Sequence, residues 1–246
     1  MDTVLFDLDG TLLPMQQEAF VEGYFSALAK KFIPFGLDSK MLIRGIWTGT
    51  KAMAENDGSI TNEKRFWQSF ALFMGQDILR LAPEFDKFYM HEFNNAKQMV
   101  GFTPLAHTCT QLLKDKGYRL IAATNPIFPA SATQNRLRWA GVDPNIFDFI
   151  TTYEHCTFCK PNLGYYREIL QKAEKAPGDC LMVGNDVNED MCAAALGIDT
   201  YLITDCLINS KNKDISTYRH GSFHDFYQFV QELPSLNEAS KSNEEE

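Results

Sequence analysis

The sequence predicts a Rossmann-like, three-layer α/β fold: a parallel sheet covered by helices, with an all-helical segment inserted after the first strand. Three observations predict this fold. Short apolar runs without polar alternation, flanked by Gly, Asp or Asn, are typical of strands buried on both faces. Helical patterns separate these runs after about residue 100, which favours a parallel sheet with right-handed crossovers. Residues 16–96 carry helical patterns and no clear strand pattern.

The sheet elements follow from these runs in chain order. The predicted strands are Val4–Phe6, Tyr118–Ala123, Phe147–Thr151, Cys180–Val183 and Tyr201–Ile203. The predicted helices are Leu105–Lys116, Ala130–Ala140, Tyr165–Lys175, Glu189–Leu196 and Phe223–Leu233. The first of these helices follows Thr103-Pro104, a typical N-cap with Pro at the first helical position, and ends at Gly117.

The inserted segment divides the chain into predicted domains. Residues 1–15 and 97–233 form the sheet domain, residues 16–96 a helical cap, and residues 234–246 a disordered acidic tail. The cap has 14 of the 31 aromatic residues. Apolar side chains lie on one face of each of two predicted helices, formed by Phe20, Tyr24, Phe25, Leu28 and Phe32 and by Phe66, Trp67, Phe70, Phe73 and Met74. Most of them are expected to fill the cap's own core, and a minority to line a pocket.

The composition narrows the function classes. The chain has 246 residues, 45% of them hydrophobic, and a formal net charge of −9. An acidic protein is a poor candidate for binding a nucleic acid backbone, although a metal ion would let it hold a small anion. The sequence has no apolar run of membrane-spanning length and no secretory signal pattern, so we expect a cytoplasmic protein with reduced cysteines. The sequence leaves the oligomeric state open.

Polar residues follow the predicted strands. Asp7 and Asp9 come at the end of the first strand, where two close carboxylates repel unless a cation or a shared proton relieves them. Mg²⁺ suits such hard oxygen ligands and leaves room for phosphate. In an open parallel sheet, ligands bind beyond the carboxyl ends of the strands. A capping Asp beside a solvated Asp is the ordinary alternative for this pattern taken alone.

Three further motifs follow later strands in the same way. They are Thr124-Asn125-Pro126, Lys160-Pro161, and the acidic run Gly184-Asn185-Asp186-Val187-Asn188-Glu189-Asp190. Taken singly, each has an ordinary interpretation as a turn, a surface lysine or a helix start. Together they place a hydroxyl, an amide, an ammonium and several carboxylates at one edge of the sheet.

This order of motifs resembles the haloacid dehalogenase-like (HAD) hydrolase superfamily over roughly residues 3–233. Its four motifs are matched by Asp7-x-Asp9-x-Thr11, Thr124, Lys160-Pro161 and Gly184-Asn185-Asp186-x-x-x-Asp190. The position of the helical insertion resembles the superfamily's cap of the first type. One departure matters: the family pattern commonly has Asp directly after the Gly of the fourth motif, where this chain has Asn185. Either Asn185 or Asp186 would then bind the metal, and we favour Asp186 because a carboxylate is the better Mg²⁺ ligand.

The resemblance implies a Mg²⁺-dependent phosphatase acting on a small phosphorylated metabolite through an aspartyl-phosphate. Asp7 would be the nucleophile and Asp9 the general acid and base. Asp7, the backbone carbonyl of Asp9 and Asp186 would hold Mg²⁺. Gly10, Thr124 and Asn125 would bind the phosphoryl group, and Lys160 would neutralise both the nucleophile and that group.

Alternatives remain open at this point. The superfamily's dehalogenases lack the second acid, so Asp9 favours phosphoryl chemistry. A phosphoglucomutase-like phosphotransferase would use the same residues, and a phosphonate hydrolase would need a cap lysine, for which Lys51 is a candidate. A catalytically silent binding protein is the non-enzyme alternative, although Asp7, Asp9 and Lys160 are all present. Cys156-x-x-Cys159 is interpreted as two ordinary thiols rather than a zinc or redox site, because no second pair follows.

Overall fold

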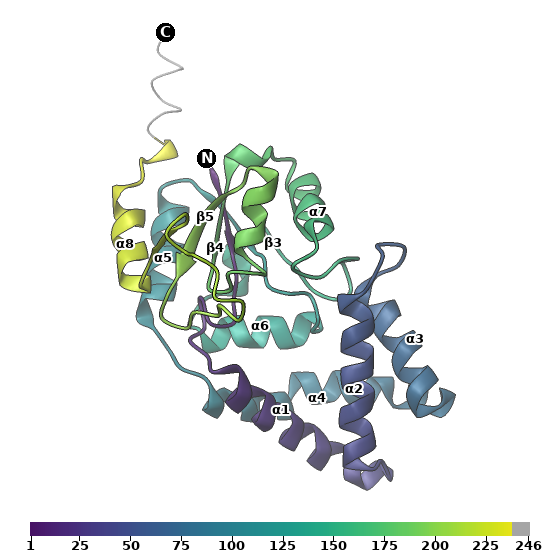
Figure 1. Ribbon diagram of the computed structural model, residues 1–246. Coiled ribbons are helices and arrows are strands. Elements are labelled where there is room, and N and C mark those ends of the chain that lie inside the picture. Colours follow the sequence, from purple (N-terminus) through teal and green to yellow (C-terminus); the bar gives the residue numbers. More distant parts are fainter. Residues whose placement is uncertain (238–246) are drawn as a thin grey trace.

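The computed structural model describes residues 1–237, and the sheet predicted from the sequence is confirmed in it (Figure 1). Six parallel strands lie in the order β3-β2-β1-β4-β5-β6. Their bounds are β1 Thr3–Phe6, β2 Arg119–Ala122, β3 Phe149–Ile150, β4 Cys180–Gly184, β5 Asp199–Ile203 and β6 Arg219–Gly221. The sequence analysis missed β6, because Arg219-His220-Gly221 is a short, polar and largely exposed edge strand with no apolar run.

Alternate residues of the central strand β1 face opposite layers of helices. Val4 and Phe6 pack into the apolar core that includes α5, α6 and α8, whereas Leu5 packs against α7. These helices span α5 Pro104–Asp115, α6 Ala130–Trp139, α7 Leu163–Ala173 and α8 Phe223–Glu232. The sheet is therefore covered on both faces, which explains why its inner strands have no polar alternation.

Helix starts agree with the capping signals in the sequence. The Thr103 hydroxyl accepts from the amide of Leu105 at the start of α5. Ser222 and Asp225 form a capping box at the start of α8. The predicted helix Glu189–Leu196 is wrong in type and start: the structure has a 3₁₀ helix, η6 Met191–Leu196. The turn before it is held by the Asp186 carboxylate, which accepts from the amides of Asn188 and Glu189.

Seven helices lie between β1 and α5, and no strand occurs there in the described chain. They are α1 Gln17–Phe32, η1 Ile33–Phe35, α2 Ser39–Ala54, α3 Asn62–Met74, η2 Gln76–Leu81, α4 Ala82–Met90 and η3 Glu92–Met99. They lie beyond the end of the sheet toward which the strands point (Figure 1). The domain boundaries at residues 16 and 96 remain a prediction.

The aromatic faces predicted for the helical segment pack mainly as expected. The five residues of the α1 face are buried, and in α3 Phe66 and Phe70 are buried whereas Trp67, Phe73 and Met74 are half-buried. The rings of Phe32 and Phe85 lie 4.1 Å apart, centroid to centroid. Two minor helices, η4 Pro144–Ile146 and η5 Pro177–Asp179, lie in connections of the sheet region.

The packed chain extends beyond the predicted end at Leu233. The amide of Leu236 donates to the carbonyl of Lys116, and the Tyr118 hydroxyl donates to the carbonyl of Pro234. The rest of the predicted tail, residues 238–246, lies outside the described residues. Within residues 1–237, every helix is too short or too polar to cross a membrane.

Candidate active site

The polar residues that follow β1, β2 and β4 line one small pocket of about 150 Å³ at the carboxyl edge of the sheet. Its lining residues include Asp7, Asp9, Thr124, Asn125, Asn185, Asp186, Glu189 and Asp190. Because β1 is hydrogen-bonded to both β2 and β4, the three strand ends meet here. The structure thus brings together the side chains that the sequence placed at separate strand ends.

Lys160 joins this group from the loop before α7. Its Nζ lies 2.8 Å from Oδ1 of Asp7 and 2.6 Å from Oδ1 of Asp190, and the Lys160 and Asp190 side chains are each 1% exposed. Burial opposes the charge on Lys160, but the Asp190 and Asp7 carboxylates hold its pKa well above the ordinary value. Lys160 is therefore a fixed positive charge beside the Asp7 carboxylate.

Asp9 is paired with a buried arginine that the sequence analysis missed. Arg136, on α6, forms an ion pair with Oδ2 of Asp9. Its guanidinium also lies 4.4 Å over the ring of Phe128 and donates to the Thr133 hydroxyl. Burial raises the pKa of Asp9, with Arg136 opposing the rise and Asp7 adding to it. Asp9 therefore holds a proton more readily than an exposed aspartate does.

Thr11, Asn185 and Gly10 form the contact between the first and fourth motifs. The Thr11 hydroxyl lies 3.1 Å from Oδ1 of Asn185 and 3.4 Å from Oδ2 of Asp7. Asn185 is buried, and its Nδ2 donates to the carbonyl of Cys206. Gly10 has φ +88°, and a Cβ built there would overlap the Asn185 amide. Gly10 thus leaves space for Asn185, in addition to any contact with substrate.

We expect Gly10→Ala to lower kcat/KM by about 10-fold or more, because Asn185 must move away from Thr11 and Asp7. Gly36→Ala is the matched control, since Gly36 has φ +78° but nothing within 4 Å of its Cβ position. Both variants should lose about 1 kcal/mol of unfolding free energy from left-handed backbone strain. Steady-state kinetics and urea unfolding separate the two effects. Equal kinetic losses in the two variants would contradict this role of Gly10.

The second motif supports the pocket through the backbone carbonyl of Thr124 and the side-chain amide of Asn125. Thr124 is buried at the pocket, and its carbonyl accepts from the Thr151 and Tyr165 hydroxyls. Asn125 Nδ2 donates to Glu189 at 3.0 Å, while Asn125 Oδ1 accepts from the backbone amide of Lys160 at 3.3 Å. Asn125 therefore fixes the loop that carries Lys160. Burial also raises the pKa of Glu189 to about 7.

The oxygen donors of the pocket suit Mg²⁺. Residues 1–237 contain no group of three or more His, Cys, Asp or Glu side chains around a common metal position. Mg²⁺, however, commonly takes one or two carboxylates and retains several waters. Asp7 and Asp186 supply carboxylates and Asn185 a neutral amide oxygen, all in one pocket. Arg136 pairs with Oδ2 of the Asp9 carboxylate, whereas Oδ1 is buried without a hydrogen-bond partner among the described residues.

A comparison with known protein families identifies the family to which this chain belongs. The model of the haloacid dehalogenase-like hydrolases matches residues 1–197, most of the chain. The chain belongs to the haloacid dehalogenase-like hydrolases. The site described above brings together the residues that the sequence analysis matched to the four motifs of this family.

Individual relatives of this haloacid dehalogenase-like hydrolase are distant. Glyceraldehyde 3-phosphate phosphatase of Methanothermobacter thermautotrophicus is 30% identical over 46% of this chain and 50% of its own length. In the curated relatives that the chain matches, the aligned segment covers half of the length or less.

Solved structures share the fold over nearly the whole chain. The HAD phosphatase of Thermococcus onnurineus has a TM-score of 0.59 at 18% identity, covering 96% of this chain and 100% of that one. The L-2-haloacid dehalogenase of Xanthobacter autotrophicus has a TM-score of 0.57 at 13% identity, covering 95% and 99%. The fold is thus common to hydrolases with different reactions, and the residues of the site must distinguish them.

The sequence analysis of this haloacid dehalogenase-like hydrolase missed Arg136. It included Asp190 in the fourth motif but gave it no role other than that of a helix-start residue. A signal for Arg136 was present: in the predicted helix Ala130–Ala140 it lies on the same face as Thr133 and Leu137, which is the buried one. For Asp190, no local pattern predicts its contact with Lys160.

Two further candidates of the sequence analysis lie outside the chemistry. The Lys51 side chain is 73% exposed, pairs with Glu55 at 3.8 Å on the surface of α2, and lines neither Asp9-containing pocket. Cys156 and Cys159 are free and buried. Burial raises the pKa of the Cys156 thiol to about 12 and also raises that of Cys159. The raised pKa values disfavour the thiolate form, so both thiols are poor nucleophiles.

Proposed function

We propose that this haloacid dehalogenase-like hydrolase is a Mg²⁺-dependent phosphatase that hydrolyses the monoester of a small phosphorylated metabolite. The observation that carries the proposal is the pair of carboxylates Asp7 and Asp9 beside the fixed charge of Lys160. A dehalogenase of the same fold needs a nucleophilic Asp but no second acid. Asp9, held at the pocket by Arg136, supplies the proton that an alkoxide leaving group requires.

In the first step, a carboxylate oxygen of Asp7 attacks phosphorus and the bond from phosphorus to the ester oxygen breaks. The leaving oxygen takes the proton of Asp9, and an aspartyl-phosphate on Asp7 remains. Asp9 then accepts a proton from water as that water attacks phosphorus, which releases phosphate and regenerates Asp7. The charge of Lys160 offsets that of Asp7 and of the phosphoryl oxygens, so that two anionic groups can approach.

Thr124 and Asn125 would hold phosphoryl oxygens by hydroxyl and backbone N–H donors, with the Gly10 backbone close by. Mg²⁺, when bound by Asp7, the Asp9 backbone carbonyl and Asp186, would neutralise further charge on the phosphoryl group. A phosphotransferase would use the same first step with an alcohol in place of water. No feature of the described residues favours that alternative over hydrolysis.

We expect 4-nitrophenyl phosphate to be hydrolysed with Mg²⁺ and not with excess EDTA, and Asp7→Asn to lower kcat by more than about 10³-fold. Asp143→Asn is the matched control, because Asp143 caps the distant helix η4 and Asn caps equally well. Phosphate release is the readout, and circular dichroism checks the fold. Activity that survives in Asp7→Asn, or that EDTA does not affect, would contradict the proposal.

The metal ligand is tested separately. Asp186→Ala should raise the Mg²⁺ concentration needed for half-maximal activity by about 10-fold or more, and Asn185→Ala should raise it less. The reverse order would assign the ligand to Asn185.

A further inference from the structure

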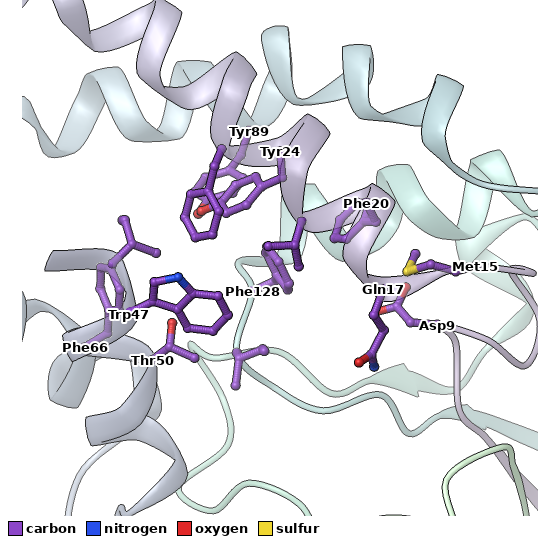
Figure 2. Close-up of a pocket in the computed structure, with 14 residues that line it drawn as sticks. Asp9, Met15, Gln17, Phe20, Tyr24, Trp47, Thr50, Phe66, Tyr89 and Phe128 are labelled. Atoms are coloured by element: carbon purple, nitrogen blue, oxygen red, sulfur yellow. The ribbon is translucent and has the colours of Figure 1, made fainter. Parts of the chain in front are cut away.

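An apolar cavity of about 260 Å³ adjoins the polar pocket on the side of the helical segment. Figure 2 shows Tyr24, Trp47, Tyr89 and Phe128 around this cavity, with Asp9 and Gln17 toward its other end. Helices α1, α2, α3 and α4 supply most of the lining, and the loop after β2 supplies Ile127 and Phe128. The cavity therefore lies between the helical segment and the sheet, where a leaving group could enter.

Three residues connect the cavity to the polar pocket. Asp9, Gln17 and Ile127 line both, whereas Asp7 and Asp190 line the polar pocket alone. In the proposed reaction the phosphoryl group lies at Asp7, and the ester oxygen lies at Asp9, which protonates it. The carbon skeleton attached to that oxygen then extends past Asp9 into the apolar cavity.

The charge of the lining limits what this skeleton can be. Among the described residues that line the cavity, Asp9 has the one carboxyl group, and no Lys, Arg or His is present. A second carboxylate or phosphate on the substrate would be buried there without a cation, which costs several kcal/mol. The hydroxyls of Tyr24 and Tyr89 lie 2.9 Å apart and largely satisfy each other, so few partners remain for a polyol.

The shape and aromatic content of the lining favour a ring. Seven of its fourteen lining residues are aromatic: Phe20, Phe25, Phe66, Phe128, Tyr24, Tyr89 and Trp47. Aromatic pairs gain energy beyond the area that they bury. An apolar cavity of about 150 Å³ in another protein binds benzene, so 260 Å³ accommodates one substituted or two fused rings.

We propose that this cavity binds the leaving alcohol, and that the enzyme prefers phosphate monoesters whose alcohol bears an uncharged aromatic ring. This assignment rests on the proposed phosphatase function and names its substrate class. Trp47 is the main accessible determinant: it is 50% exposed on α2, and its ring centroid lies 5.5 Å from that of Phe25. A bound ring would cover the exposed apolar face of the indole.

The test compares esters whose alcohols have similar acidity, so that the chemical step is matched. We expect kcat/KM for 2-phenylethyl phosphate to be at least 30-fold higher than kcat/KM for ethyl phosphate. It should also be higher than kcat/KM for glyceraldehyde 3-phosphate by a similar factor. Trp47→Ala should reduce the ratio of kcat/KM for 2-phenylethyl phosphate to that for ethyl phosphate to below 5-fold, because kcat/KM falls less for ethyl phosphate. Met41→Ala, on the same helix and 40% exposed but outside the cavity lining, should leave the ratio unchanged.

Each outcome decides one proposal. Equal kcat/KM values for all esters, or a preference for glyceraldehyde 3-phosphate, would overturn the aromatic preference and leave the phosphatase proposal standing. Absence of phosphate release from every ester, 4-nitrophenyl phosphate included, would contradict the phosphatase proposal. In that event, calorimetric titration with 2-phenylethyl phosphate still tests the cavity: binding that is weaker in Trp47→Ala supports it, and equal binding in both proteins overturns it.

Discussion

Lys160→Met is expected to abolish measurable turnover and to lower the free energy of unfolding by about 3–5 kcal/mol. Lys160 is the cation between Asp7 and Asp190, at 2.8 and 2.6 Å, and it is almost completely buried. Its loss leaves two close carboxylates without compensation in a site of low dielectric. The nucleophile then repels the phosphate dianion, and the folded state retains an unpaired buried charge.

The measurement is urea unfolding at pH 8 in EDTA, together with phosphate release in Mg²⁺. Lys175→Met is the matched control, since Lys175 pairs with Asp2 at 2.6 Å but both side chains are partly exposed. This variant should lose less than about 1 kcal/mol of unfolding free energy. Combining Lys160→Met with Asp190→Asn should recover part of the lost stability but not the activity. If the two lysine variants lose equal stability, the buried cluster is not the source of the effect.

Arg136→Met is expected to lower kcat/KM for an alkyl phosphate by about 10²-fold, and that for 4-nitrophenyl phosphate by much less. Arg136 holds the Asp9 carboxylate from α6 and is itself packed against Phe128. Without it, Asp9 is free to turn away from the ester oxygen. An alkoxide cannot leave without a proton, whereas nitrophenolate is stable enough to leave without one.

Because kcat/KM reports events up to departure of the leaving group, comparing the two substrates isolates the proton transfer from Asp9. Arg138→Met is the matched control, as Arg138 is exposed on the same helix two residues later. It should leave both substrates unaffected. Equal losses for both substrates in Arg136→Met would indicate general damage to the site rather than misplacement of Asp9.

Much of the fold could be predicted from local patterns. Five of the six strands and most of the helices around them follow from unalternating apolar runs, cap residues such as Thr103, and stop signals such as Gly117. The strand β6 could not, because Arg219-His220-Gly221 pairs at the sheet edge without burying an apolar side chain. The η6 region differs from its prediction because side-chain bonds of Asp186 hold the preceding turn.

The sequence by itself determined that Asp7, Asp9, Thr124 and Lys160 follow strands of one parallel sheet, and therefore that they lie at one edge. Only the tertiary structure decided which groups meet there. Lys160 contacts Asp7 across 153 residues, Arg136 reaches Asp9 across 127, and Thr11 reaches Asn185 across 174.

The physical reason is the range of the interactions. Strand burial and helix capping depend on neighbours a few residues away, so short stretches of sequence are enough to predict them. Ion pairs and cavities depend on the direction of side chains from separate elements, which is set when those elements pack. The apolar cavity beside Asp9 belongs to this second kind, since its lining comes from four helices and from the loops after β1 and β2.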